Sequence, residues 1–253
     1  MHFPKYWARG QATSGSSSAS CWRWSDVSED DARQKANQRA AELAALFASG
    51  RRLDRYSYGD RPLREEIVQR LDNGVVITRN LYGALVLNAE RAMFIDVDFG
   101  DGAGEGAAIQ RVQQWTASHP ELAVRVYRTH AGLRLLVTNH TYDPKSAEAI
   151  ALLEEVGTDK LYIQLCKAQA SFRARLTPKP WRIGMKEPRV RFPYESAEQH
   201  GELLHWVSHY ELASKKASVC KLLETTGPAS VLDEIRPLLA YHDHVAVGDQ
   251  PLA

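Results

Sequence analysis

The chain has 253 residues, of which 44% are hydrophobic and 25% are charged, and its formal net charge at pH 7 is +1. This is a globular composition, long enough for one large domain or two small ones. It excludes a global electrostatic attraction to nucleic acid or membrane, so any basic surface must be local. The three cysteines are widely spaced and predict neither a disulfide framework nor a zinc site. The sequence shows no apolar leader and no apolar run of membrane length, so we expect a reducing, cytoplasmic protein without a membrane partner.

The first 75 residues predict an N-terminal helical or α+β lobe. Ser28 and Asp31 have the spacing of a capping box, which indicates a helix that ends near Gly50. Pro62 stands where proline is favoured, at the start of a second helix. We expect an extended aromatic segment at residues 1–9, a flexible serine-rich loop at 11–20 and a short strand at 21–24. A helix at 29–49, a polar connector at 51–60 and a second helix at 63–71 then follow.

The remaining chain predicts an α+β fold with a mainly antiparallel sheet core of RRM-like or palm-like architecture. Strands are expected at residues 75–80, 82–88, 93–98, 122–129 and 134–138, and helices at 106–119, 143–156, 159–171 and 197–221. The end of the chain, from residue 225, predicts a loosely structured tail. We therefore expect an N-terminal lobe, a core with a basic segment, and a C-terminal helical segment with a tail, at residues 1–75, 76–192 and 193–253.

The stretch Ala92–Phe99 predicts a central strand that carries two acids. Its bulky apolar residues fall on both faces, as in a strand covered on both sides. Asp96 and Asp98 are two residues apart, so the period of a strand puts both carboxylates on the same face. Two buried acids are costly unless they are neutralised, and Mg²⁺ or Mn²⁺ with hard oxygen ligands is the usual remedy. Alternatively, the acids cap the next helix or pair with arginine.

Residues 172–191 form a basic segment with interleaved aromatic residues. Arg173 and Arg175 share one side if the stretch is extended, which favours a common anionic partner, and Phe172 or Trp181 is placed to stack on the bases of a single strand. The alternative is a rigid connector with its aromatic residues in the core. The expected nucleic-acid contacts are Arg173, Arg175, Lys179, Trp181 and Arg182.

An apolar strand ending in Asp-x-Asp, then a helix, a strand with Tyr-Arg-Thr, a small turn and a further strand resembles the archaeo-eukaryotic primase (primase-polymerase) superfamily, over about Arg79–Arg182. The resemblance implies that Asp96 and Asp98 bind divalent metal. In that family a following hairpin motif contacts nucleotide phosphates. The sequence Thr129-His130-Ala131-Gly132-Leu133-Arg134 is similar to this motif, with Arg134 where the family has histidine. A third acidic ligand is matched by order alone, at Asp143 or Asp159.

The expected site joins metal ligands to groups that hold phosphate. Arginine can bind a phosphate through two parallel hydrogen bonds, and an unbroken strand would put Arg128 and Arg134 on one face. The expected catalytic residues are Asp96, Asp98 and Arg134. The expected nucleotide-binding residues are Arg79, Asn80, Arg128 and Thr129. The alternative is that Arg128 and Arg134 form ion pairs with Asp96, Asp98 or Asp101, since structural ion pairs imitate sites.

The sequence thus predicts a primase-polymerase-like nucleotidyltransferase, active or inactive, that handles nucleotides or single-stranded nucleic acid with Mg²⁺ or Mn²⁺. Two alternatives stay open: a non-catalytic nucleic-acid-binding protein on an RRM-like scaffold, and a structural or partner-binding protein. His205 and His209 are four residues apart, a spacing that can bind zinc. No glutamate accompanies them, and we expect these two and His242 and His244 to have surface or packing roles.

Overall fold

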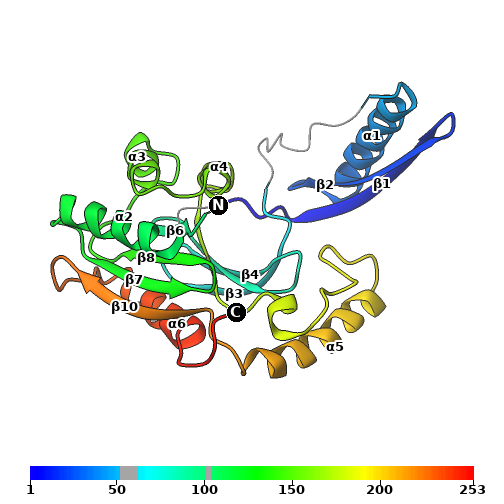
Figure 1. Cartoon of the computed structure of the whole chain (residues 1–253). Coiled ribbons are helices and arrows are strands. Elements are labelled where there is room, and N and C mark those ends of the chain that lie inside the picture. Colours follow the sequence, from blue (N-terminus) through cyan, green and yellow to red (C-terminus); the bar gives the residue numbers. More distant parts are fainter. Residues whose placement is uncertain (52–61, 101–103) are drawn as a thin grey trace. The chain divides into compact units, whose positions relative to one another are not determined.

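The computed structural model describes residues 1–51, 62–100 and 104–253. These residues form two compact units, His2–Arg64 and Glu65–Ala253, the second including Met1 (Figure 1). The α+β prediction is confirmed, because the described residues hold six α-helices and three antiparallel sheets. None of the helices in the described ranges is long and apolar enough to cross a membrane.

The N-terminal unit is a two-stranded hairpin with one helix on it. Its elements are β1, β2 and α1, at Tyr6–Ser14, Ser17–Ser25 and Glu29–Ala48. The predicted helix is confirmed, and the Ser28 hydroxyl accepts a hydrogen bond from the Asp31 amide as its cap. The polar connector expected at 51–60 lies outside the described residues beyond its first position.

The flexible loop predicted at residues 11–20 is wrong, because these residues complete the hairpin. Small residues alternate along β1, and Ala8 and Gly10 are buried against α1. A Cβ atom on Gly10 would lie 2.2 Å from the carbonyl carbon of Ala36, so only glycine permits this close approach. The serine-rich composition therefore reflects a strand with small residues on one face and hydroxyls on the other.

The larger unit holds two four-stranded antiparallel sheets, ordered β3-β4-β5-β9 and β10-β7-β8-β6. The first sheet consists of β3 (Glu66–Leu71), β4 (Val75–Arg79), β5 (Leu85–Ala89) and β9 (Phe172–Arg175). The second consists of β10 (Cys220–Thr226), β7 (Val124–Thr129), β8 (Gly132–Val137) and β6 (Phe94–Asp98). The helix predicted at 63–71 is wrong, since Glu66–Leu71 is β3. The signal that decides it is Asn73-Gly74, both with positive φ, which turns the chain into a hairpin with β4.

Helices connect the strands of the second sheet in a split β-α-β pattern. The helices α2, α3 and α4 span Gly104–Ser118, Ala147–Glu155 and Lys160–Gln169. Strand β8 lies between β6 and β7, and the chain order β6-α2-β7-β8-α3/α4-β9 follows the β-α-β-β-α-β order of RRM-like folds. The last strand of this order, β9, pairs with β5 in the first sheet and not with β6. The Tyr162 hydroxyl donates to the Phe94 carbonyl at 2.9 Å and accepts from the Arg173 amide at 3.2 Å, and so joins β6 to β9.

The sequence after residue 193 adds two helices and one strand to this unit. Helix α5 spans Ala197–Ser214 and helix α6 spans Arg236–Ala246. The helix predicted over 197–221 therefore ends early, because Cys220 begins β10. The loose tail predicted from residue 225 is also wrong, because α6 packs on the sheet through Asp243, whose carboxylate accepts from the Tyr127 hydroxyl at 2.8 Å.

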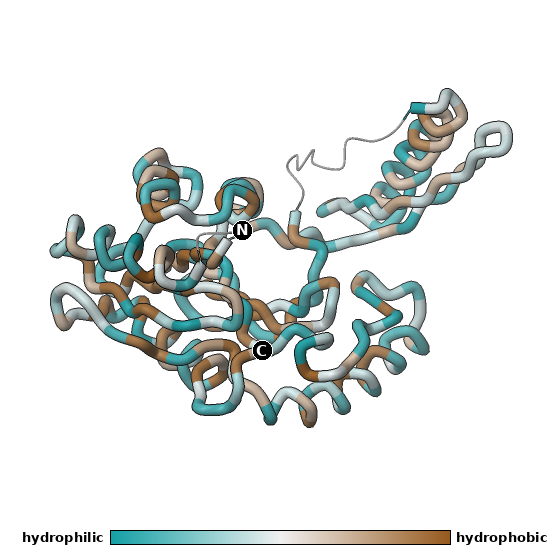
Figure 2. The backbone as a smooth tube through the Cα atoms, in the orientation of Figure 1, coloured by the Kyte–Doolittle hydropathy of each residue, from teal (hydrophilic) through white to brown (hydrophobic). Residues whose placement is uncertain are grey.

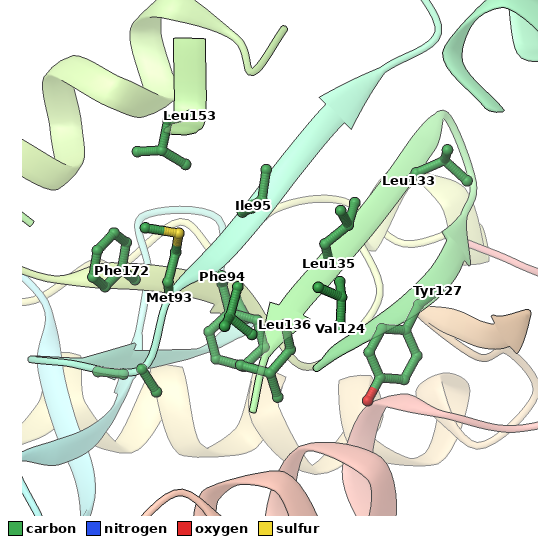
Figure 3. Close-up of a cluster of buried hydrophobic side chains, with 14 of the residues drawn as sticks. Met93, Phe94, Ile95, Val124, Tyr127, Leu133, Leu135, Leu136, Leu153 and Phe172 are labelled. Atoms are coloured by element: carbon green, nitrogen blue, oxygen red, sulfur yellow. The ribbon is translucent and has the colours of Figure 1, made fainter. Parts of the chain in front are cut away.

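The core lies on both faces of the second sheet. In Figure 3, Ile95, Leu133 and Leu135 stand on one side of neighbouring strands, and Phe94, Leu136 and Tyr127 on the other. Figure 1 shows α2 over the first face and α6 over the second. The prediction of a strand covered on both faces is confirmed, since Phe94, Ile95 and Val97 are all fully buried. The predicted central position is wrong, because β6 is the last strand in the sheet order and pairs only with β8.

Candidate functional site

A cavity of about 1050 Å³ opens between the two sheets of the larger unit and is the largest one that the described residues line. It gathers side chains from β6, β8, β9, α4, the β4–β5 turn and the segment after β9. Its polar and aromatic lining includes Asp96, Asp98, Arg134, Arg173, Arg175, Asp159, Tyr162, Asn80, Tyr82, Thr129, Lys179 and Arg182. Most residues that the sequence singled out therefore lie in one place.

Asp96 and Asp98 lie on the same face of β6, as predicted, and both reach the cavity. In the pairing of β6 with β8, Asp96 stands opposite Arg134 and Asp98 opposite Gly132. Burial raises the pKa of Asp98, and the neighbouring carboxylates of Asp96 and Asp159 raise it further. Crowded carboxylates of this kind attract a cation.

Arg134 connects the two sheets below this carboxylate pair. Its guanidinium is 3% exposed, and its Nε donates to Asp96 Oδ1 at 3.1 Å. Its Nη1 donates to the Arg175 carbonyl at 2.8 Å, which is in β9 of the other sheet. Burial is the largest effect and disfavours the charge, but the Asp96 carboxylate together with Cys220 and Tyr162 outweighs it, so the pKa of Arg134 is raised. The ion-pair alternative thus holds for Asp96, while Asp98 has no such pair among the described residues.

Arg128 lies on the other face of the sheet, so the turn between β7 and β8 does not bring it to Arg134. It pairs in register with Leu133 rather than with Arg134. Its guanidinium binds Glu105 of α2, with Nε 2.7 Å from Oε1, and stacks over Phe99 at 4.2 Å. The structure therefore places Arg128 away from the cavity, in an ion pair with an acid that the sequence did not single out.

Arg79 and Asn80, at the start of the β4–β5 turn, were both expected to contact a nucleotide, but only Asn80 lines the cavity. Arg79 donates to the Gly83 carbonyl at 2.9 Å and lies 3.7 Å from Glu66, outside the cavity lining. Asn80 does line the cavity, but its Oδ1 accepts from the backbone amides of Tyr82 and Ala84. Its first role is to hold the turn that presents Tyr82.

In the described part of the chain, Asp159 is one of four acids that line the cavity, with Asp96, Asp98 and Glu65. It caps α4 by accepting from the Leu161 amide at 3.2 Å, and it lines the cavity with Asp96 and Asp98. Asp143, the other candidate by order, lies before α3 and accepts from the Lys145 amide outside the cavity. Throughout residues 1–51, 62–100 and 104–253, no three metal-ligating side chains converge on one point. Asp96 and Asp98 nevertheless offer carboxylate oxygens, the donors that Mg²⁺ and Mn²⁺ prefer, and Mg²⁺ is commonly bound by one or two carboxylates plus substrate phosphate.

Three cations face the carboxylates without ion pairs of their own among the described residues: Arg175, Lys179 and Arg182. Burial lowers the pKa of each, and the pKa of Arg175 is lowered further by Arg134 and that of Lys179 by Arg182. The Arg175 guanidinium donates to the Thr177 carbonyl at 2.9 Å and to the backbone oxygen of Ala253 at 3.5 Å. Arg173 differs, because it binds both oxygens of Glu65 at 2.7 and 2.8 Å.

An aromatic pair lies beside the cavity mouth. Trp181 is 50% exposed and meets Tyr82 edge-on, with ring centroids 5.3 Å apart. The Lys179 ammonium lies 5.5 Å from the Trp181 ring. Phe172, which the sequence also offered for stacking, is fully buried and belongs to the core.

A buried chain of hydrogen bonds from Asp243 through His242 supports Arg134, and the sequence did not predict it. His242 of α6 is fully buried, with Nδ1 3.0 Å from Asp243 Oδ1 and Nε2 3.5 Å from Arg134 Nη1. Arginine only donates, so Nε2 is the acceptor and Nδ1–H donates to Asp243. Burial lowers the pKa of His242 and keeps the ring neutral. No sequence signal marks this contact, because it joins a helix near the chain end to a strand more than a hundred residues earlier.

Comparison of the chain with protein-family models, with curated proteins and with solved structures found no match.

Proposed function

We propose that this chain is a primase-polymerase-like nucleotidyltransferase that binds a nucleotide polyphosphate with Mg²⁺ or Mn²⁺ in the cavity between the two sheets. The reaction class is attack of a hydroxyl oxygen on the α-phosphorus, with pyrophosphate as the leaving group. The proposal extends the resemblance of the Asp-x-Asp strand and the Thr129–Arg134 hairpin to the primase-polymerases.

The observation that carries the proposal is Arg175, a part-buried cation with no aspartate or glutamate partner among the described residues. A buried charge is costly unless it is paired, and this one faces Asp96 and Asp98 across the same cavity. A ligand that neutralises both sides of the cavity needs negative groups next to Arg175, Lys179 and Arg182. It also needs a cation next to Asp96 and Asp98. A metal–polyphosphate complex has this charge pattern.

Each group of this chain has a role in the proposed reaction. Asp96 Oδ2 and Asp98 would hold the metal ion, which when bound would neutralise charge on the transferred phosphate. Arg134 fixes the Asp96 carboxylate by its hydrogen bond at 3.1 Å. Arg175 and Lys179 hold the leaving phosphates, whose charge grows as the bond to the α-phosphorus breaks. Trp181 and Arg182 at the mouth contact the acceptor strand.

The test is calorimetric titration of the full chain with Mn²⁺ and ATP, followed by an extension assay on a primed single strand. We expect Asp98→Asn to remove the Mn²⁺-dependent heat and to reduce product at least about 100-fold, since the metal ligand is lost. Glu105→Gln is the matched control, because it neutralises an acid of the same unit on the opposite face of the sheet. Wild-type protein that gives neither metal heat nor product contradicts the proposal.

A second candidate is a non-catalytic nucleic-acid-binding protein. It is favoured by one observation, the ion pair that occupies Asp96 Oδ1. In that case a labelled single strand binds with unchanged affinity in EDTA and in Mn²⁺, and no product forms with either cation.

A further inference from the structure

The outer face of the β1–β2 hairpin, which the proposed function does not use, has the composition of a binding surface. Strand alternation divides the hairpin into two faces, and α1 packs on the face of Ala8 and Gly10. Three tryptophans stand on the other face together with one arginine, one glutamine, one threonine and two serines. In register these are Trp7 opposite Trp24, Arg9 opposite Trp22, Gln11 opposite Ser20, and Thr13 opposite Ser18.

The tryptophans form a continuous aromatic strip. The rings of Trp7 and Trp24 are 5.7 Å apart, and the Arg23 guanidinium lies 6.0 Å from the Trp24 ring. Arg9 is exposed beside Trp22 and donates to the Ser20 hydroxyl at 3.4 Å. Each tryptophan keeps part of its surface open to solvent. Hydropathy colouring leaves the hairpin mostly pale in Figure 2, since serine, threonine, glycine and tryptophan lie near the middle of that scale.

The charge of the hairpin has one sign. Residues 6–25 contain Arg9 and Arg23 and no acid, and Lys5 comes just before them. Acids follow only after the hairpin, and most are held there by cations: Asp26 by His2, Glu29 by Arg33, Asp31 by Lys35 and Glu42 by Arg39. Aromatic faces, cations and hydroxyl donors, on a hairpin whose own residues 6–25 include no acid, are complementary to a polyanion with flat bases.

We propose that this face binds single-stranded nucleic acid, with bases stacked on Trp7, Trp22 and Trp24 and a phosphate held by Arg9. The six residue steps of strand from Trp7 to Thr13 extend about 20 Å, enough for a few nucleotides. The hydroxyls and amide toward the hairpin tip donate to phosphate or sugar oxygens. This binding needs neither metal nor the cavity, so it stands or falls apart from the proposed function.

The test is fluorescence anisotropy of the full chain with a labelled oligothymidylate of about 15 nucleotides, in EDTA and at several salt concentrations. We expect Trp22→Thr to weaken binding at least about fivefold, the lower end for one lost base stack. Trp22→Tyr restores most of the affinity, which separates stacking from folding. Arg9→Ala lowers the slope of log K against log salt by about 0.7, the value for one phosphate contact on a single strand.

Two controls make each outcome decisive. Arg33→Ala removes a cation from α1 of the same unit and is expected to leave affinity and slope unchanged. Asp98→Asn removes the proposed metal ligand and is expected to leave this binding intact, whatever it does to nucleotidyl transfer. If Trp22→Thr and Arg9→Ala both bind the oligonucleotide like the wild type, the inference is overturned, and the strip serves a protein partner instead.

Discussion

Two groups of cations in the larger unit differ in how the fold treats their charge. Arg125, Arg128 and Arg173 each meet a carboxylate, from Asp243, Glu105 and Glu65. Arg175, Lys179 and Arg182 meet no aspartate or glutamate among the described residues, although burial lowers the pKa of all three. The first group fastens helices and strands to one another. All three members of the second group line the cavity, as does Arg173, whose charge Glu65 already matches. The proposed anion-binding side of the cavity therefore rests on these unmatched, part-buried cations and not on the basic sequence as a whole.

The largest effect is expected from breaking the matched group at Asp243. This carboxylate accepts from Arg125 at 2.6 Å and from the Tyr127 hydroxyl at 2.8 Å, and it orients His242. Asp243→Ala leaves a part-buried guanidinium and a buried hydroxyl without their acceptor, and should cost about 3 kcal/mol of unfolding free energy. Denaturant unfolding measures it. The control is Glu29→Ala, which breaks the exposed ion pair with Arg33. If Asp243→Ala loses less unfolding free energy than Glu29→Ala, the distinction between matched and unmatched cations is removed.

Removing an unmatched cation should act in the opposite direction on stability. Arg175→Met takes away a buried charge, so we expect unfolding free energy to rise by about 1 kcal/mol, and Tm by about 2–4 °C. The same change should weaken ATP binding about 10- to 100-fold, because charge-assisted hydrogen bonds to phosphate are lost. Differential scanning calorimetry and titration measure the two.

The matched control is Arg128→Met, in β7 of the other sheet and outside the cavity lining. It should lower stability slightly and leave ATP affinity unchanged, since its partner Glu105 is half exposed. If both variants lose stability and keep ATP binding, the cavity cations have no ligand role.

The smallest effect concerns pH and the buried His242. Its pKa is lowered in the folded protein, so on acidification the unfolded chain takes up the proton first, below about pH 6.5. Stability should therefore fall from pH 7.5 to 5.5, by about 1.3 kcal/mol at most from this residue. In His242→Phe the urea-unfolding midpoint should lose that part of its pH dependence, whereas in His205→Gln it should keep it. An unchanged pH dependence in His242→Phe would show that the ring is charged in the folded state.

The sequence was sufficient for the elements whose pattern is local. Alternation and bulk placed β4, β5, β6, β7 and β8, and the Ser28 capping box placed α1. It failed where tertiary contacts decide: the serine-rich segment became a strand because Gly10 sits under α1, and residues 63–71 became β3 through the Asn73-Gly74 turn. The tail became α6 because its polar groups meet partners on β7 and β8.

For the candidate site the same division holds. The spacing of Asp96 and Asp98 on one strand face is local and was predictable. Which arginine faces them depends on the register of the β7–β8 turn, and which acid joins them depends on where α4 begins. The contact of His242 with Arg134 depends on the packing of a distant helix, which neither spacing nor composition encodes.

Gly132 gives the carboxylate strand an evolutionary constraint. A Cβ atom there would lie 2.3 Å from the Val97 carbonyl oxygen and 3.1 Å from the Asp98 Cα atom, so any side chain would push the end of β6 away. The position of Asp98 therefore depends on glycine at position 132. A homologue that replaces Gly132 and keeps Asp96 and Asp98 would hold the two carboxylates displaced from the cavity that they now line.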